Sequence, residues 1–284
     1  MTKILITGAS GYLGQTLTPI AATQADIIGI ARNTDTISEH ANAIAVDIQD
    51  RASVMDIVRS HKPDAIIHCA ACNPGGSDTD MFAVNEHGTG NIADAASESR
   101  CRLVAVSSDT VFNGQGAPFS DDAAASPLLE NIYAVSKARG EALIRTRAPS
   151  AAIVRTSLIY GTDKIDRGTE GFANRLASGQ TLKLFNDVIR QPVDCRSLSS
   201  NLCALALKHT NENGFINIMG NEALSRYDFG VRMLDYWGID YNDRLEAVSG
   251  VGIAGLPIDL RVTMDRAMQL ALPTPGLTEV LGLL

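Results

Sequence analysis

A tyrosine and a lysine four positions apart are the clearest candidates for chemistry in this sequence. They occur in Tyr133-Ala134-Val135-Ser136-Lys137, a spacing that places both side chains on one face of a helix. A neighbouring ammonium group favours the phenolate and lowers a tyrosine pKa that is ordinarily about 10. Such a tyrosine can exchange a proton with a hydroxyl or carbonyl group. Ordinary helices also carry this pair by chance, so other residues must support an acid–base site.

A hydroxyl group that can orient the same carbonyl stands at the end of a predicted strand. The apolar residues 103–107 are typical of a buried parallel strand, and Ser107-Ser108-Asp109 stand at its carboxyl end. We expect Ser108 to donate a hydrogen bond to a substrate carbonyl. A simple turn is the alternative for these residues.

Three glycines follow the first predicted strand at intervals of three residues. Gly8, Gly11 and Gly14 come after Ile4-Leu5-Ile6 and open a helix expected from Leu13 to about Ala22. Glycine there permits a tight turn, close approach of a phosphate to the backbone, and close packing of the helix on its strand. The free N–H groups of the helix start can then bind a pyrophosphate. A glycine-rich turn without a ligand is the alternative.

The residues after the second and third strands concern the adenosine end of a dinucleotide. An acidic residue after the second strand marks NAD, whereas arginine accommodates the 2′-phosphate of NADP. Here Arg32 and Asn33 follow Ala31, so we favour NADP(H) as the cofactor, with NAD(H) as the alternative. If no dinucleotide binds, Arg32 is expected to be a solvated surface residue. Asp47 can accept from the adenine amino group with Ile48 against the ring, or it can cap a helix.

Alternating strands and helices must position these residues. Strands are predicted at 4–6, 26–31, 43–46, 65–68, 103–107 and 151–155, and one long helix is expected after Ser77 to near Glu98. This pattern predicts an α/β Rossmann fold, a doubly wound parallel sheet with helices on both faces and a smaller C-terminal α/β substrate-binding lobe. The NAD(P)-binding domain is expected at 1–157. The lobe is expected at 158–284, with about 191–220 packing back on the Rossmann core and a polar lid at 160–180.

Composition excludes several classes of function. The 284 residues carry a formal net charge of −8 with no long basic cluster, which argues against a nucleic-acid partner. No apolar run approaches the roughly 18 residues of a membrane span, and the first residues do not resemble a signal peptide. Five scattered cysteines, including the pair at 69 and 72, favour reduced thiols without a metal. We therefore predict a cytoplasmic protein with no membrane partner.

Five motifs together resemble the extended short-chain dehydrogenase/reductase family. Besides the glycine loop and the Tyr133/Lys137 pair, these are His68-Cys69-Ala70-Ala71, the segment 85–91 that matches Asn-x-x-Gly-Thr-x-Asn, and the segment 154–161. They occur in the family's order over about residues 3–161. The resemblance implies a dinucleotide cofactor that contacts a defined set of residues. These are Gly8, Ser10, Gly11, Tyr12, Leu13, Gly14, Arg32, Asn33, Asp47, Ile48, Cys69, Ala70, Ala71, Asn85, Ser107, Tyr133 and Lys137.

Within that family the sequence is similar to the dTDP-4-dehydrorhamnose reductase group. The segment 107–114 resembles that group's Ser-Thr-Asp-Tyr-Val-Phe-Asp-Gly, and the segment 256–265 resembles its late Pro-x-Asp-x-x-Leu-Asp. The resemblance implies that Ser108 orients the substrate carbonyl with its hydroxyl and that Tyr133 donates the proton. It implies that Lys137 lowers the pKa of Tyr133 and holds the nicotinamide ribose. Thr110 and the loop 190–194 depart from the group's pattern on the substrate side.

The resemblance implies transfer of hydride from NADPH to a keto-sugar, with a nucleotide-linked sugar expected. The alternatives are a nucleotide-sugar epimerase and, in another class, a regulatory subunit that binds NADP without turnover. A homodimer is compatible with the chain. The expected substrate contacts are Ser108, Asp109, Thr110, Arg155, Tyr160, Arg190 and Gln191, with Arg190 the better cation for a sugar diphosphate.

Overall fold

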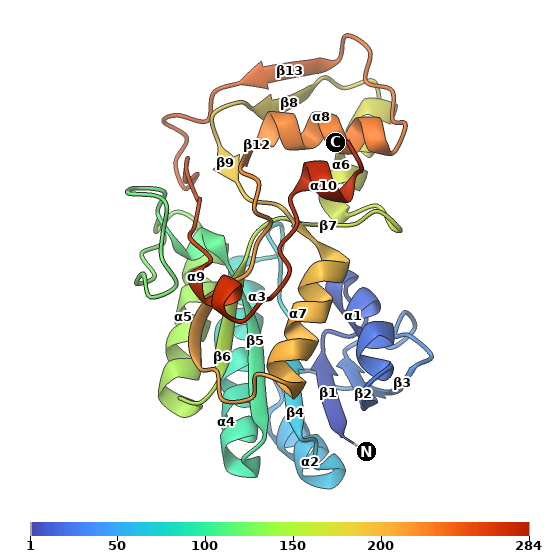
Figure 1. Cartoon of the computed structure of the whole chain (residues 1–284), viewed down its shortest axis with the longest axis vertical. Coiled ribbons are helices and arrows are strands. Elements are labelled where there is room, and N and C mark those ends of the chain that lie inside the picture. The colour runs from blue at the N-terminus through green and yellow to red at the C-terminus, as the bar shows by residue number, and fades with distance from the viewer. Residues whose placement is uncertain (1, 284) are drawn as a thin grey trace.

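Seven parallel strands form the central sheet of the computed structural model, which describes residues 2–283. Their order is β11-β6-β5-β4-β1-β2-β3 (Figure 1). The strands are β1 (Lys3–Thr7), β2 (Asp26–Ala31), β3 (Ala41–Ala45), β4 (Ala65–His68), β5 (Arg102–Ser108), β6 (Ala152–Thr156) and β11 (Gly214–Asn217). The order reverses between β1 and β4, as in a doubly wound sheet. The predicted Rossmann fold is confirmed.

Helices cover both faces of this sheet because alternate strand residues point to opposite sides. Ile4 and Ile6 of β1 belong to one buried cluster with α1 (Tyr12–Ala22) and α7 (Cys195–Leu207), while Leu5 belongs to the cluster on the other face. That second cluster is built with α2 (Arg51–His61), α4 (Thr89–Ser99) and α5 (Ile132–Arg147). The two layers hold the carboxyl ends of the strands at one edge of the sheet.

The long helix expected up to Glu98 is interrupted. It consists of α3 (Asp78–Phe82), a π-helical segment (Ala83–Gly88) and α4. α5 lies close against the widened turn, since a Cβ on Gly140 would lie 2.3 Å from the carbonyl oxygen of Asn85. π-Helical turns often occur at functional sites, and here the turn carries Asn85.

Short strands and helices build a lobe above the carboxyl ends of the sheet (Figure 1). Three two-stranded sheets pair β7 (Ile159–Tyr160) with β10 (Val193–Asp194), β9 (Ile189–Arg190) with β12 (Leu224–Ser225), and β8 (Leu182–Phe185) with β13 (Leu245–Val248). The helices after β6, apart from α7, are α6 (Arg167–Ala177), α8 (Arg226–Tyr236), α9 (Asp265–Gln269) and α10 (Leu277–Val280).

The lid expected at 160–180 is wrong for much of that segment. Residues 167–177 form α6, and Leu176 of this helix packs with Leu182, Leu184 and Leu234 in a buried cluster. The amphipathic helix therefore serves as a layer of the lobe's core. This packing role was not predictable from the sequence, because most residues of α6 are polar or glycine.

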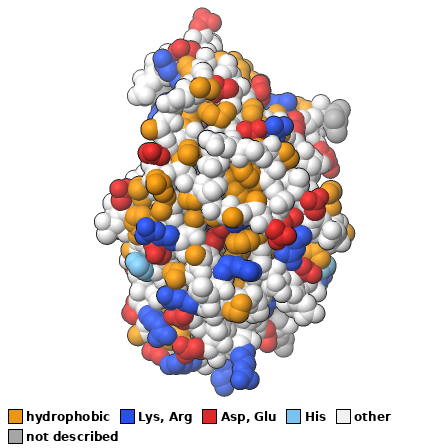
Figure 2. All heavy atoms as spheres, turned by 90° about the vertical axis from the view of Figure 1, so that its left-hand side faces the viewer, with side chains coloured by type: hydrophobic (Ala, Val, Ile, Leu, Met, Phe, Trp, Pro, Cys, Tyr) orange, Lys and Arg blue, Asp and Glu red, His pale blue; other side chains and the backbone are white. Residues whose placement is uncertain are grey.

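After β10 the chain returns to the Rossmann half. α7 packs beside α1, and β11 pairs with β6 at the edge of the sheet. Within residues 2–283, no helix is long and apolar enough to cross a membrane. Figure 2 shows one face of the molecule, on which apolar side chains gather at mid-height and basic and acidic side chains are interspersed.

Candidate active site

A cavity of about 810 Å³ opens at the carboxyl ends of the central strands, beneath the lobe. Parallel α/β sheets bind their ligands at this place, and the volume lies in the usual range of ligand pockets. The described structure brings every expected cofactor-binding residue to this cavity except Asn85. Asn85 lies just behind the wall, where its amide donates to the carbonyl oxygen of Cys72 at 2.9 Å and accepts from its N–H at 2.8 Å.

The glycine loop has the geometry of a phosphate-binding turn. Gly8 has a φ of +68°, and a Cβ there would lie 2.7 Å from the backbone nitrogen of Ala70. A Cβ on Gly14 would lie 2.2 Å from the carbonyl oxygen of Gly8. Gly11 precedes α1 and offers no side-chain cap, so the first N–H groups of the helix face the cavity without a side-chain acceptor. These donors fit the pyrophosphate of a dinucleotide.

The residues expected beside the adenosine of a dinucleotide line the cavity; these are Arg32, Asn33, Asp47 and Ile48. The helix-cap alternative for Asp47 is wrong, because Asp50 caps α2 by accepting from two N–H groups of its first turn. Asp47 accepts from the N–H of Gln49 at 3.0 Å and still lines the cavity. Arg32 is exposed and makes no side-chain hydrogen bond or ion pair within residues 2–283, so it is available to a 2′-phosphate.

A buried histidine at the end of β4 connects β1 and α4. His68 is 1 % exposed; its Nδ1 lies 2.7 Å from the hydroxyl of Thr7 and its Nε2 lies 3.0 Å from the hydroxyl of Thr89. Thr7 also accepts from the N–H of Ala70 at 3.1 Å. Burial, aided by the charge of Lys137, lowers the pKa of His68 to about 3, so the ring is neutral.

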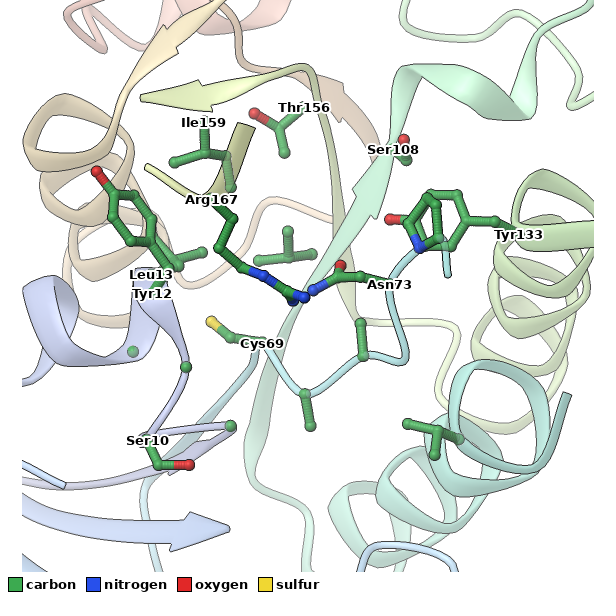
Figure 3. Close-up of a pocket in the computed structure, with 18 of the residues that line it drawn as sticks. Ser10, Tyr12, Leu13, Cys69, Asn73, Ser108, Tyr133, Thr156, Ile159 and Arg167 are labelled. Carbon is green, nitrogen blue, oxygen red and sulfur yellow. The ribbon is translucent and has the colours of Figure 1, made fainter. Parts of the chain in front are cut away.

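The three expected catalytic residues lie on one side of the cavity. Figure 3 shows Ser108 and Tyr133 across the cavity from Tyr12 of α1. Ser108 ends β5, and Tyr133 lies in the first turn of α5, which Asn131 caps. One turn later, Lys137 donates from Nζ to the carbonyl oxygen of Val106 at 2.8 Å.

Burial controls the pKa values of this group. It raises the pKa of Tyr133 to about 12, against the opposing effect of a hydrogen bond with Ser108. It lowers the pKa of Lys137 to about 8, while the carboxylate of Glu141 acts in the other direction. The expectation that Lys137 lowers the pKa of Tyr133 is therefore wrong for the chain alone. The desolvation of the phenol outweighs nearby charges, and the ammonium group is engaged with the backbone of β5.

Several expected substrate residues do not line the cavity. Arg155 is fully buried and donates to Glu141 from Nε at 3.0 Å and from a terminal nitrogen at 2.8 Å. Gln191 is held by the N–H of Val262 and the carbonyl oxygen of Gly220. Both side chains serve the packing between elements.

Of the other expected substrate residues, Asp109, Thr110 and Arg190 lie at the carboxyl end of β5, and Tyr160 lies in the lobe. Asp109 is fully buried and forms an ion pair with Arg190. The hydroxyl of Thr110 lies 2.9 Å from that of Ser108. Tyr160 is buried against Phe229, and its hydroxyl has no hydrogen-bond partner among the described residues.

The cavity also contains polar residues that were not named as site residues from the sequence. Arg167 and Arg226 are the first residues of α6 and α8, and Ser157 follows β6 with a buried hydroxyl that lacks a partner in the described part of the chain. Burial and the charge of Arg190 lower the pKa of Arg226 to about 10. Ser225 caps α8 by accepting from the N–H of Asp228, but nothing local in the sequence indicated that the next residue faces the cavity. Among residues 2–283, no group of three or more His, Cys, Asp or Glu is placed to hold a metal ion.

Comparison with known proteins places this arrangement in a family. Residues 1–261 match the model described as the RmlD substrate binding domain. The chain belongs to this family. It is 29 % identical to the dTDP-4-dehydrorhamnose reductase of Aggregatibacter actinomycetemcomitans, over 83 % of this chain and 79 % of the relative. It is also 25 % identical to the methionine adenosyltransferase 2 subunit beta of Danio rerio, over 84 % of this chain and 74 % of that protein.

A solved structure has the same fold over nearly the whole chain. The dTDP-4-dehydrorhamnose reductase of Bacillus anthracis, in complex with NADP, superposes with a TM-score of 0.84. The two sequences are 24 % identical, and the match covers 99 % of this chain and 98 % of the other. The chain is thus an RmlD-family protein of the extended short-chain dehydrogenase/reductase type, with the fold expected from the sequence.

Proposed function

We propose that this chain is an NADPH-dependent reductase that acts on the keto group of a nucleotide-linked sugar. The observation that carries the proposal is one cavity that contains Ser108, Tyr133 and Lys137 as well as Arg32. Arg32 follows β2 and Ser108 ends β5, so the two lie three strand positions apart in the sheet. Arg32 would hold the 2′-phosphate of a dinucleotide, the glycine loop its pyrophosphate, and Ser108, Tyr133 and Lys137 would face the reacting end, since all of them line one cavity. The named activity of the relative from A. actinomycetemcomitans supports this reaction.

The catalytic residues are suited to reduction of a carbonyl. The chemistry that bound NADPH supplies is a hydride for the keto carbon. Because its pKa is about 12, Tyr133 is protonated and can give its phenolic proton to the keto oxygen, which becomes a hydroxyl. Ser108 orients that oxygen by hydrogen bonding. Lys137 lies one helical turn from Tyr133 and can bind the hydroxyls of the nicotinamide ribose.

The lobe side of the cavity can accept an anionic sugar substrate. Arg226 lines the cavity, is partly buried, and makes no side-chain hydrogen bond with any residue from 2 to 283. Arg190 was the expected cation for a sugar diphosphate, but its guanidinium is bound to Asp109. Arg226 therefore replaces it in this proposal. Phe229 and Ser157 line the same cavity.

Asp109 favours reduction over reactions that need a second acid or base. Its carboxylate is fully buried and accepts two hydrogen bonds from Arg190. A carboxylate in this state is not available to move a proton at a sugar carbon. This supports a reductase over an epimerase.

A binding subunit without turnover is the second candidate, and one observation favours it. The relative from Danio rerio is named as a subunit of methionine adenosyltransferase rather than as a reductase. The presence of Ser108, Tyr133 and Lys137 together in the cavity favours catalysis.

A turnover assay separates the two candidates. NADPH consumption is followed with a panel of nucleotide-linked 4-keto sugars, and NADPH affinity is measured in parallel by fluorescence titration. Turnover with one of these substrates, reduced sharply in Ser108→Ala, is the expected result. NADPH binding without turnover on any member of the panel would identify a binding subunit. A cytoplasmic location and a homodimer stay predictions of the sequence.

A further inference from the structure

The loop before α6 is hydrogen-bonded to residues at the start of α1. The hydroxyl of Tyr12 donates to the carbonyl oxygen of Lys164 at 2.7 Å, and Nζ of Lys164 donates to Oε1 of Gln15 at 2.6 Å. A Cβ on Gly161 would lie 2.5 Å from the Tyr12 hydroxyl, so the loop also touches Tyr12 at its beginning. Residues 161–166, which we call the strap, thus cross the helix start that follows the glycine loop.

The strap ends in a helix cap that fixes the position of Arg167. The carboxylate of Asp166 accepts from the N–H of Gly168 at 2.9 Å, from the N–H of Thr169 at 3.1 Å and from the Thr169 hydroxyl at 2.6 Å. Arg167 is the next residue and lines the cavity. In Figure 3 its side chain runs from α6 across the cavity, above Cys69, with the guanidinium toward Asn73.

The guanidinium of Arg167 has no anionic partner in the described part of the chain. It takes part in none of the ion pairs or side-chain hydrogen bonds among residues 2–283, and the neighbouring Asp166 is occupied by its cap. The cavity contains the first turn of α1, whose N–H groups have no side-chain acceptor. A free cation and an uncapped helix start in one cavity both favour a doubly charged anion between them.

We infer that Arg167 binds the pyrophosphate of the dinucleotide from the lobe side. The strap carries this arginine to the cofactor by its attachment to Tyr12, so the cofactor is held by the Rossmann half and by the lobe together. This inference rests on the dinucleotide part of the proposed function and does not require turnover. The diphosphate of a sugar nucleotide offers the same chemistry, and the experiment distinguishes the two sources.

The first test compares Arg167→Gln with Arg175→Gln, which removes the same charge from an exposed position later in α6. NADPH affinity is measured by fluorescence titration, with adenosine 2′-monophosphate as a second probe that lacks the diphosphate. Arg167→Gln is expected to weaken NADPH about ten- to a hundredfold, the effect of losing a hydrogen bond to a charged group. It should leave adenosine 2′-monophosphate binding unchanged, and Arg175→Gln should change neither.

Two results would overturn the inference. One is unchanged NADPH affinity in Arg167→Gln together with a raised KM for the sugar nucleotide, which would assign this arginine to the substrate. The other is equal weakening of NADPH and adenosine 2′-monophosphate, which would indicate a general disturbance of the fold.

The role of the strap is tested by a double-mutant cycle. Tyr12→Phe keeps the ring but removes the hydroxyl that holds Lys164. We expect it to weaken NADPH binding in the native background and to add nothing in the Arg167→Gln background, because the strap acts through that arginine. If the two substitutions weaken NADPH binding additively in the double variant, the strap does not act through Arg167. The expected results of both experiments are changes in ligand affinity. The inference can therefore be tested even if the protein does not reduce a keto-sugar.

Discussion

The carboxylate of Asp109 accepts two hydrogen bonds from the guanidinium of Arg190, one of them from Nε at 2.7 Å. Asp109 directly follows Ser108 at the end of β5, whereas Arg190 belongs to β9 of the lobe. Both side chains are nearly or fully buried. The pair thus joins the lobe to the end of the strand that carries Ser108.

Breaking this pair should destabilise the protein strongly. Asp109→Asn leaves the Arg190 cation buried without its counter-ion, for which the expected loss is about 3–5 kcal/mol in the free energy of unfolding. Denaturation in urea measures the loss. Arg196→Ala breaks the exposed pair with Asp163 and should cost at most about 1 kcal/mol. An equal loss in the free energy of unfolding for the two substitutions would show that the buried ion pair contributes no more stability than the exposed one.

The neutral state of His68 predicts a loss of stability in acid. Its pKa is about 3 in the folded protein and near 6.5 when unfolded, so between these values the unfolded chain binds more protons. Stability therefore falls as the pH drops from 6.5 toward 3, with a slope of at most about 1.4 kcal/mol per pH unit from this residue. Urea denaturation at several pH values should show a smaller acid loss in His68→Asn. The exposed His87→Asn is the control and should retain the native slope.

Arg32 should set the preference between the two dinucleotides. Arg32→Ala removes the cation expected at the 2′-phosphate, so kcat/KM for NADPH should fall about tenfold or more relative to NADH. Arg51→Ala serves as the control because Arg51 pairs with Asp94 and Glu98 on an exposed surface. An unchanged ratio in Arg32→Ala would remove the argument for NADP.

Glu141 should raise the pH at which Lys137 loses its charge. The ammonium form of Lys137 is lost as the pH rises through its pKa of about 8, and the Glu141 carboxylate keeps that pKa from falling further. In Glu141→Gln, the alkaline limb of the pH profile of kcat/KM should move to lower pH. The profile is recorded well below the unfolding temperature, because Glu141 also pairs with Arg155. An alkaline limb that stays at the native pH would show that the loss of charge on Lys137 does not cause it.

The Rossmann half was predictable because its signals are local. Gly8, Gly11 and Gly14 follow a strand at fixed spacing, and Tyr133 and Lys137 share one helix face, so the sequence alone assigns both to the edge of a parallel sheet. The structure brings them to one cavity as expected.

Arg155 shows where local signals fail. It stands at the end of a strand, as a substrate-binding arginine would, yet its guanidinium is held by Glu141 of α5 and lies 3.8 Å from the ring centroid of Phe215. Those partners belong to α5 and β11, and no pattern around Arg155 reveals that these elements pack against it.

The lobe was the least predictable part for a related reason. Its paired strands β7, β9, β10 and β12 are two residues long, too short for a hydrophobic period to be read. Arg167 and Arg226 reach the cavity because α6 and α8 begin at its rim, and the placement of those helices depends on contacts among the short strands. Of the expected substrate residues the cavity accordingly contains Ser108 alone, whereas it contains every expected cofactor residue except Asn85.

Tyr133→Phe tests the central claim most directly. The variant keeps the ring of Tyr133 and removes only the proton that the proposed reduction requires, and Tyr241→Phe on the lobe surface is the matched control. NADPH consumption with a nucleotide-linked keto-sugar should fall roughly 10²- to 10⁴-fold in Tyr133→Phe, with NADPH affinity unchanged. Tyr241→Phe should retain full turnover. Turnover by Tyr133→Phe at the native rate would contradict the assignment of the proton donor and with it the proposed mechanism.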